Sequence, residues 1–334
     1  MQVDSETVTA QQKSALSSKF LSGALSLALA SCLGSFQVMR FNDALPYQEA
    51  ENINTEKIRL VYFNAADFRG NTTNLFKFIS TETSQDRTKC FGEFCKRVGA
   101  DIVAVSEVDW YSLKTGNLDQ PEAIIQAMGS PYNYLVVDQY LKSPLWTTGN
   151  MAISLFPLKT VHRQLFGDHD DLDTRLGHYF KDFIHLRAKV GLSSQEELDL
   201  LITHLDEDEN SVSFRRKEQA REMTAYIREL KQSNPSAYII VAGDFNDSYN
   251  SKVMKMFLKD GLLHLPEENY DLPTFQADNP SLDLDHILAS SNVKITHYQS
   301  FEVKDKEGEL LSDHLGVMCD LELLKNQELT PSSK

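Results

Sequence analysis

The sequence predicts an α/β fold in which stacked β-sheets form the centre and helices cover the outside. Short apolar runs recur between residues 58 and 323, each bounded by polar or turn-forming residues, as in buried strands. Residues 213–231 instead carry apolar side chains at helical spacing, with a charged opposite face. No internal repeat, low-complexity linker or change of composition interrupts the chain after residue 57. These observations favour one domain of stacked sheets over two separate domains.

Strand and helix patterns alternate along the chain. Helical patterns occur at residues 86–98, 121–128, 213–231 and 252–259. Strand patterns are more numerous and occur at residues 58–64, 101–107, 134–137, 150–156, 183–190, 198–205, 238–244, 284–289, 295–302 and 314–323. Cys90 and Cys95 fall in the first helix, where a rise of about 1.5 Å per residue separates them too far for a disulfide. We therefore expect both thiols to be free.

Residues 238–248, which read Tyr-Ile-Ile-Val-Ala-Gly-Asp-Phe-Asn-Asp-Ser, give the first indication of a site. An apolar run reaches Gly243, and Asp244 and Asn246 follow two residues apart. Residues at this spacing on an extended chain point the same way. A carboxylate that can polarise a water and an amide that can hold an oxygen would then lie side by side. An Asx-rich turn after a core strand is the alternative.

The composition is that of a globular protein with an acidic surface. Of 334 residues, 41% are apolar and 24% are charged, and the formal net charge is −15. Such a surface repels polyphosphate backbones unless a basic patch or bound cations compensate, which argues against avid, unspecific binding of nucleic acid. It is compatible with hydrolysis of a phosphodiester through a divalent metal, because acidic pockets hold such ions.

The first 32 residues have the pattern of an export signal. Lys13 and Lys19 precede an apolar run that is too short to span a bilayer and ends in Leu29-Ala-Ser-Cys32. This end resembles the lipobox of bacterial lipoproteins, in which Cys32 would be acylated; a plain cleaved signal or an amphipathic tail are the alternatives. We divide the chain into a signal peptide (1–32), a tether (33–57), one folded domain (58–325) and a frayed tail (326–334).

Polar residues of the Asn, Asp, Glu and His type end or interrupt the apolar runs at six places. One carboxylate at a strand end is usually a cap or turn residue, but six such places are difficult to assign to turns. They are Asn64, Glu107, the pair His204 and Asp206, the pair Asp244 and Asn246, Asp285, and the triplet Ser312-Asp313-His314.

In this order the motifs resemble those of the endonuclease/exonuclease/phosphatase superfamily, and the resemblance covers residues 58–323. The motifs that carry it are Asn64, Glu107, Thr203-His-Leu-Asp206, Gly243-Asp-Phe-Asn246, Leu284-Asp-His-Ile and Ser312-Asp-His314. The resemblance implies an α/β fold of four layers, an α-β-β-α sandwich with two packed mixed β-sheets and the site at one end. His204 is similar to a feature of the deoxyribonuclease I and neutral sphingomyelinase branches.

The resemblance also implies a metal cofactor, Mg²⁺ or Mn²⁺. Glu107 would hold the ion, with Asn64 and Asp313 near it. Hard oxygen ligands suit such an ion, which keeps several of its waters. The ion would neutralise the phosphate oxygens as charge grows on them.

Five further residues receive catalytic roles from the resemblance. His314, paired with Asp285, would be the base or a charged stabiliser, since a carboxylate fixes one tautomer of the imidazole and raises its basicity. Asp244 would orient the attacking water and Asn246 would steady the phosphoryl oxygen. His204 would donate to a phosphate oxygen or to the leaving group.

Softer similarities suggest substrate-binding residues. Asn150, in Gly149-Asn-Met-Ala-Ile-Ser, resembles a strand common in bacterial members, although its sequence also fits a simple strand start. Arg175 is a candidate phosphate-binding cation, because few cations lie near the other motifs. Arg216 and Gln219, one helical turn apart, are either a functional pair or part of a solvated face.

We therefore predict an exported, lipid-anchored, monomeric phosphoester hydrolase, with a phosphodiester favoured as substrate. A phospholipid, a small phosphodiester and a nucleic acid are all candidates, because one such site serves several substrates. Phe63 and Ser106 stand where the family often has Trp and Gln, which weakens any inference about substrate. The alternatives are an extracytoplasmic nuclease on DNA or RNA, and a binding lipoprotein without turnover.

Overall fold

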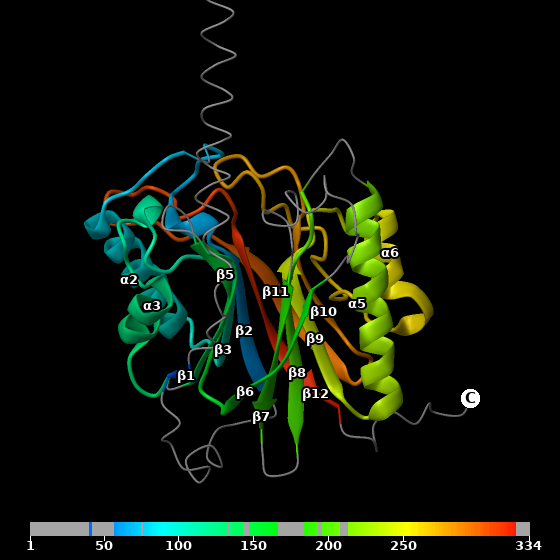
Figure 1. Cartoon of the computed structure of the whole chain (residues 1–334). Coiled ribbons are helices and arrows are strands. Elements are labelled where there is room, and N and C mark those ends of the chain that lie inside the picture. The colour runs from blue at the N-terminus through cyan, green and yellow to red at the C-terminus, as the bar shows by residue number, and fades with distance from the viewer. Residues whose placement is uncertain are drawn as a thin grey trace, which may run out of the picture. The chain divides into compact units, whose positions relative to one another are not determined.

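Two mixed β-sheets lie face to face at the centre of the molecule, and helices cover their outer faces (Figure 1). The structure, a computed structural model, describes residues 40–41, 57–74, 76–132, 134–142, 147–165, 184–192, 196–207 and 213–324. Strand order in the first sheet is β1-β4-β5-β3-β2-β12-β11, and in the second sheet it is β10-β9-β8-β7-β6. Each sheet contains a parallel pair, β2 with β3 and β8 with β9.

The first sheet consists of β1 (Arg40–Phe41), β2 (Lys57–Asn64), β3 (Ile102–Val108), β4 (Tyr134–Lys142), β5 (Thr147–Ser154), β11 (Val293–Phe301) and β12 (Gly316–Leu323). The second consists of β6 (Leu158–Leu165), β7 (Ile184–Gly191), β8 (Glu197–His204), β9 (Tyr238–Asp244) and β10 (Asp285–Ala289). The helices are α2 (Thr81–Arg97), α3 (Gln120–Met128), α5 (Ser213–Ser233) and α6 (Lys252–Leu258), with short 3₁₀ turns η2 (Ala66–Phe68), η3 (Leu113–Thr115) and η4 (Lys259–Gly261).

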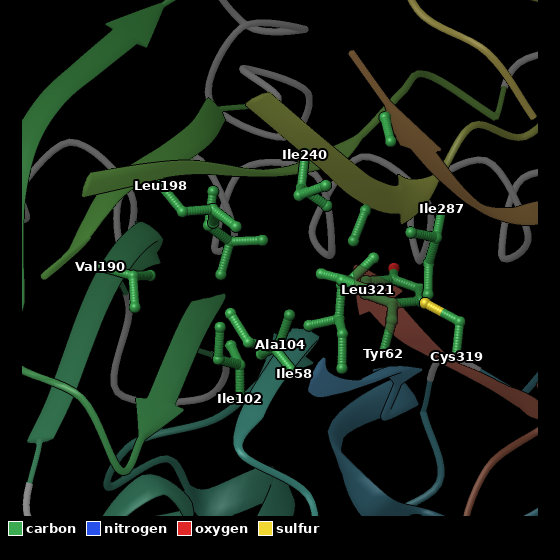
Figure 2. Close-up of a cluster of buried hydrophobic side chains, with 14 of the residues drawn as sticks. Ile58, Tyr62, Ile102, Ala104, Val190, Leu198, Ile240, Ile287, Cys319 and Leu321 are labelled. Atoms are coloured by element: carbon green, nitrogen blue, oxygen red, sulfur yellow. The ribbon is translucent and has the colours of Figure 1, made fainter. Parts of the chain in front are cut away.

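The central strands are apolar throughout because both of their faces are buried. On β2, Ile58, Leu60 and Tyr62 face the second sheet, whereas Val61 and Phe63 face the helices. Figure 2 shows the core between the sheets, to which Ile58 and Tyr62 contribute. Successive side chains on a strand point to opposite faces, so a strand covered on both sides reads as a continuous apolar run.

The helices form the two outer layers. Buried side chains of α2 and α3 pack on the outer face of the first sheet, and those of α5 and α6 pack on the outer face of the second. Ser80 begins α2 by accepting a hydrogen bond from Thr83 N–H at 3.1 Å, and Asp119 begins α3 by accepting one from Glu122 N–H at 3.1 Å. The predicted α/β fold with two packed mixed sheets is thereby confirmed.

The structure differs from the sequence-based expectation in two strands. The sequence analysis missed β6, the edge strand of the second sheet, which pairs with β7. It also placed Arg40 and Phe41 in a tether, whereas they form β1 and pair with Val136 and Leu135 of β4. The cysteines Cys90 and Cys95 are free, as expected.

The remaining expectations about the ends of the chain are not addressed by the structure. The signal peptide with Cys32, most of the expected tether and the tail 326–334 lie outside the described residues. Among the helices of the described ranges, none combines the length and the hydropathy needed to cross a membrane.

Candidate active site

Strand alternation brings three predicted site residues to the inner face of the second sheet. Leu200 and Ile202 on β8 lie in the core between the sheets, so His204, next on the same face, emerges at the strand end. By the same alternation Asp244 ends β9 and Asp285 begins β10. The register pairs Asp244 with both His204 and Asp285, so the three side chains lie side by side at one end of this sheet.

Gly243 allows β8 and β9 to approach closely just before the site. A Cβ atom added at Gly243 would lie 2.3 Å from the Thr203 carbonyl oxygen and 2.5 Å from the Thr203 methyl carbon. Any other residue would therefore push the strands apart where they carry His204 and Asp244. The glycine of the Gly-Asp-Phe-Asn motif is thus required by the packing of the two strands.

A β-bulge turns Glu107 towards the site. The register between β3 and β5 shifts between Val105 and Val108, and Glu107 has a φ of 52°. Without the bulge, Glu107 would follow Val103 and Val105 to the helix-covered face, because these residues alternate. Bulges commonly redirect a side chain next to an active site. The carboxylate of Glu107 accepts a hydrogen bond from Asn64 Nδ2 at 3.2 Å.

Asn64 and His204 connect Glu107 with Asp244 across the two sheets. Asn64 Nδ2 also donates to Asp244 Oδ2 at 3.0 Å. His204 Nδ1 lies 3.6 Å from Glu107 Oε1, and its Nε2 lies 3.7 Å from Asp244 Oδ2. Groups from both sheets therefore form one continuous polar cluster.

His314 completes the cluster through an ion pair with Asp285. Its Nδ1 lies 2.8 Å from Asp285 Oδ2, and its Nε2 lies 3.7 Å from Asp244 Oδ2. Burial opposes the charge on the imidazole, but Asp285 outweighs it and raises the pKa of His314 to about 10. The ring of Phe275 packs at 4.9 Å from the imidazole ring, measured between centroids. His314 is therefore an imidazolium at neutral pH, which favours the stabilising role over the role of base.

The carboxylates of the site differ in their affinity for protons. Burial and the neighbouring Asp285 raise the pKa of Asp244 to about 6, and burial raises the pKa of Asp313 to about 6. Burial also disfavours ionisation of Glu107, but the charges of His204 and His314 hold the pKa of Glu107 below its ordinary value. Glu107 is thus the most acidic of these three groups.

The donor set fits a hard divalent cation. Carboxylate oxygens dominate it, and the buried Asp285 Oδ1 has no hydrogen-bond partner. Ligand atoms of Asp244, Asp285 and His314 all lie within 4.8 Å of one another. However, Asp285 and His314 already bind each other through a hydrogen bond. The Glu107 side chain is 24% exposed, so solvent can reach it, as a Mg²⁺ ion that retains waters requires. The exposure of Glu107 is compatible with the expectation that it would hold a metal, and that assignment stays a prediction.

Asn64 contacts Glu107 directly, and Asp313 is close enough for the charge of Glu107 to contribute to its raised pKa. Ser312 Oγ donates to the Asn64 carbonyl oxygen at 2.8 Å, which ties Asp313 to the end of β2. The Asn64 Oδ1 atom accepts from Ala66 N–H at 3.0 Å. Its second lone pair is the one that could bind a cation.

Three other predicted residues occupy distinct positions. Asn246 has a φ of 48°, donates its N–H to Asp244 Oδ1 at 2.7 Å, and donates Nδ2 to the Leu205 carbonyl oxygen at 2.8 Å. Asn150 is buried on β5, one residue from the Gly149 position that faces the bulge. Arg175 lies outside the described residues.

Arg216 and Gln219 hold the loop that follows His204. Arg216 Nε donates to the Asp206 carbonyl oxygen at 2.6 Å, and Gln219 Oε1 accepts from Asp206 N–H at 2.9 Å. Arg216 also lies 3.6 Å from Asp247 Oδ2. The pair therefore does more than cover a solvated face, since it fixes the backbone beyond His204.

Comparison with known proteins agrees with this geometry. Residues 71–314 match the sequence model of the Endonuclease/Exonuclease/phosphatase family. The chain belongs to this family. The match includes every site residue from Glu107 to His314 but begins after Asn64, whose assignment depends on its contacts. A search of curated protein sequences found no significant match.

Solved structures of the endonuclease/exonuclease/phosphatase family share the fold. A family protein from Bacteroides thetaiotaomicron has 16% identity and a TM-score of 0.57, with 79% of this chain and 97% of that chain covered. Truncated TDP2 from Caenorhabditis elegans has 16% identity and a TM-score of 0.56, with 80% and 98% covered. A mannosyl-6-phosphatase from B. thetaiotaomicron has 14% identity and a TM-score of 0.55, with 79% and 99% covered.

The sequence analysis missed a buried ion pair beside the family site. Lys114 Nζ lies 2.8 Å from Asp67 Oδ2, with side-chain exposures of 2% and 0%. Ala66, Asp67 and Phe68 have φ values of 43°, 56° and 57°, a left-handed turn without glycine that begins two residues after Asn64. Such strained turns persist only where surrounding contacts hold them. Here Lys114 binds the Asp67 carboxylate, and Gln120 Nε2 donates to the Asp67 carbonyl oxygen at 2.8 Å.

We expect Lys114→Met to reduce both stability and activity. Removing one partner of a buried ion pair typically lowers the free energy of unfolding by about 3–5 kcal/mol. The loss here should be smaller, because Arg69 Nε also lies 3.3 Å from Asp67 Oδ2. Because the Asp67 turn also orients Asn64, kcat for a phosphodiester should fall as well. Urea unfolding and initial rates, measured where the variant is still folded, check both effects.

Arg187→Met is the matched control. Arg187 on β7 forms a buried ion pair with Asp199 on β8, with 2.7 Å between its NH2 atom and Asp199 Oδ1. Asp199 lies five residues before His204 on the same strand. The Arg187→Met replacement should reduce stability while leaving kcat close to wild type. Equal loss of kcat in both variants would show that Lys114 has no particular influence on the site.

Proposed function

We propose that this protein is a metal-dependent phosphodiesterase. The observation that carries the proposal is the Asp285–His314 ion pair directed at Asp244, beside Glu107 and His204. This combination brings together a cationic donor, a carboxylate of raised pKa and a partly exposed carboxylate. Members of the family act on phosphoesters, which supports a phosphoester hydrolase in general.

The residues of the chain supply the proton transfers. Asp244, with a pKa of about 6, is suited to accept a proton from a water that attacks phosphorus at neutral pH. As the phosphorus–oxygen bond to the leaving group breaks, the leaving oxygen takes a proton from a nearby donor, for which His204 is placed. His314 donates Nε2–H to a phosphate oxygen and stabilises its charge. Asn246, fixed by two hydrogen bonds, steadies the phosphoryl group from the other side.

Glu107, Asp313 and Asn64 would hold the cation, Mg²⁺ or Mn²⁺. When bound, the ion supplies positive charge to the phosphate oxygens. Lys114 lies near Glu107 but is engaged with Asp67. Among the described residues named at this site, His314 is then the group that faces the substrate with positive charge.

A phosphodiester is favoured over a phosphomonoester because it carries one negative charge rather than two, and the described part of the site combines several carboxylates with few cationic groups. The structural relatives include both TDP2 and a mannosyl-6-phosphatase, so the fold alone does not select between these substrates.

The assay compares bis-p-nitrophenyl phosphate with p-nitrophenyl phosphate in the presence of Mg²⁺, of Mn²⁺, and of a chelator. We expect metal-dependent hydrolysis of the diester to exceed that of the monoester, and the chelator to stop both. A panel of plasmid DNA, RNA and sphingomyelin then defines the natural class of substrate. Faster hydrolysis of the monoester would contradict the proposal, and no hydrolysis of any substrate would favour a binding protein.

We also propose that the protein is exported and anchored by lipid on Cys32. The apolar run before Leu29-Ala-Ser-Cys32 supports this proposal. Mass spectrometry of the mature amino terminus would show an acylated cysteine, and an unprocessed Met1 would contradict export.

A further inference from the structure

Large apolar side chains are exposed at one end of the molecule. Among the described residues six stand out, and all belong to three loops, after β2, after β3 and before β10. We call them the apolar rim: Phe76 (76% exposed), Phe78 (55%), Tyr111 (56%), Leu113 (58%), Tyr270 (37%) and Leu282 (46%). β2 ends in Asn64, β3 carries Glu107 and β10 begins with Asp285. The loops that form the rim are therefore connected to strand ends that carry site residues. Figure 1 shows these three loops at the same end of the sheets.

Hydrogen bonds join the first two loops into one surface. Ile79 N–H donates to the Lys114 carbonyl oxygen at 3.0 Å, and Thr81 Oγ1 donates to the Gly116 carbonyl oxygen at 2.6 Å. The segment that contains Phe76 and Phe78 therefore lies along the segment that contains Leu113. Gly70 N–H donates to the Leu311 carbonyl oxygen at 3.0 Å, which connects this surface to the triplet that ends in His314.

The third loop contacts the opposite side of the site. Phe275 and Leu282 form a pair of backbone hydrogen bonds at 3.0 Å each, and the Phe275 ring packs against His314. Tyr270 stacks edge-on against Tyr249 with ring centroids 4.9 Å apart. Tyr249 N–H in turn donates to Asp283 Oδ2 at 2.9 Å, two residues before Asp285. The rim thus flanks the polar cluster on two sides.

We propose that the apolar rim docks the active site on a zwitterionic phospholipid surface, so that the phosphodiester substrate is presented at a lipid–water interface. The proposal rests on the proposed function and names its substrate class. Side chains exposed to this degree gain free energy when they leave water, and a concentration of them around a site marks a binding surface.

Charge and side-chain type favour a lipid over a nucleic acid as the ligand of the apolar rim. The formal net charge of −15 disfavours polyanions and acidic lipid surfaces, but not a headgroup without net charge. Four of the six rim side chains are aromatic and suit either bases or lipid, but Leu113 and Leu282 offer no ring on which a base could stack, and the mixture of aliphatic and aromatic side chains suits acyl chains.

A local fluorescent probe tests the docking without any assay of activity. Each probe is placed in a full chain in which Trp110 and Trp146 are replaced by Phe, so that it is the only tryptophan. Phe76→Trp should then shift its emission to shorter wavelength on addition of phosphatidylcholine vesicles, and bromine on the acyl chains should quench it. Gln232→Trp is the control, because Gln232 is exposed near the end of α5, which runs back from the end of β8 to the start of β9. Absence of quenching at position 76, or equal quenching at position 232, would overturn the proposal.

Kinetics separate the rim from the catalytic groups. Phe76→Ser combined with Phe78→Ser should lower hydrolysis of vesicle phospholipid at least about tenfold, because two rings that would enter the lipid on docking are lost. Hydrolysis of soluble bis-p-nitrophenyl phosphate should stay near wild type. An equal loss on both substrates would overturn the proposal. If the wild type hydrolyses neither substrate, the proposed function fails, while quenching still reports on the rim.

Two further controls identify other occupants. A shift of the Phe76→Trp emission with an oligonucleotide but not with vesicles would assign the rim to nucleic acid. A shift that depends on protein concentration alone would assign it to a second copy of the chain. Either result overturns the lipid proposal.

Discussion

Replacement of His314 by alanine is expected to lower kcat for a phosphodiester by about 10³-fold or more while the fold survives. The imidazolium is the buried cation paired with Asp285, and it faces Asp244 where a phosphate oxygen would lie. Without it, the charge that develops on that oxygen is not stabilised and the Asp285 carboxylate is left without its partner. Steady-state kinetics with bis-p-nitrophenyl phosphate measure the effect, with far-UV circular dichroism to verify folding.

His297→Ala is the matched control for His314→Ala. His297 lies on β11 in the first sheet, and β11 is the strand that pairs with β12, which begins two residues after His314. The His297 side chain is 68% exposed and contacts Asp320 rather than the site. Its replacement should leave kcat unchanged. A wild-type kcat in His314→Ala would remove His314 from the mechanism.

The pH dependence of stability gives an independent check on the charge of His314. Its pKa in the folded protein is about 10, above its ordinary value of 6.5. The stabilisation from the Asp285 pair is therefore complete below pH 6.5 and is lost as the pH rises through 10. The wild type should lose melting temperature between pH 8 and pH 10 relative to the His314→Ala variant.

Removal of divalent metal is expected to abolish turnover and to lower the melting temperature at neutral pH. A ligand at 100 times its dissociation constant stabilises by about 2.7 kcal/mol, which corresponds to a shift of about 5–10 °C for a domain of this size. The physical reason is the group of carboxylates around Glu107, whose mutual repulsion the cation offsets. Differential scanning calorimetry with Mg²⁺, Mn²⁺ and a chelator measures the shift.

The metal effect should depend on pH in a defined direction. Asp244 and Asp313 have pKa values of about 6 in the folded protein, above their ordinary value of 3.8. The folded state therefore binds protons more tightly, and its stability falls as the pH rises from about 3.8 to about 6. A cation competes with these protons, so it should raise the melting temperature more at pH 7.5 than at pH 5. Glu107→Gln should largely remove the difference; an unchanged metal response in that variant would exclude Glu107 as a ligand.

The sequence predicted which polar side chains lie together where strands carry them. Strand alternation is rigid, so the apolar residues of β8, β9 and β10 determine the face on which His204, Asp244 and Asp285 emerge. The roles of these residues in the reaction stay predictions. Glu107 is brought to the same place by a bulge, which its sequence, Ser-Glu-Val, does not reveal.

The features that the sequence analysis missed have no regular spacing of apolar residues that would identify them. β6 has a register shift between Thr160 and His162, which disrupts the alternation that identifies an edge strand. Lys114 lies on a short 3₁₀ turn, where a lysine is expected to face solvent. The left-handed turn at Ala66–Phe68 contains no glycine, the usual signal for such a turn. Only the fold brings Asp67 and Lys114 together, 47 residues apart in the chain.

The division of the site between two sheets makes catalysis dependent on their relative alignment. Asn64 and Glu107 are carried by the first sheet, and His204, Asp244 and Asp285 by the second. A slip of one sheet by a single residue would move one half of the reacting groups past the other by about 3.3 Å. That distance exceeds the tolerance of a positioned reaction. The apolar layer between the sheets takes no part in the proposed chemistry. Its packing nevertheless fixes the alignment of the two groups of site residues that the chemistry requires.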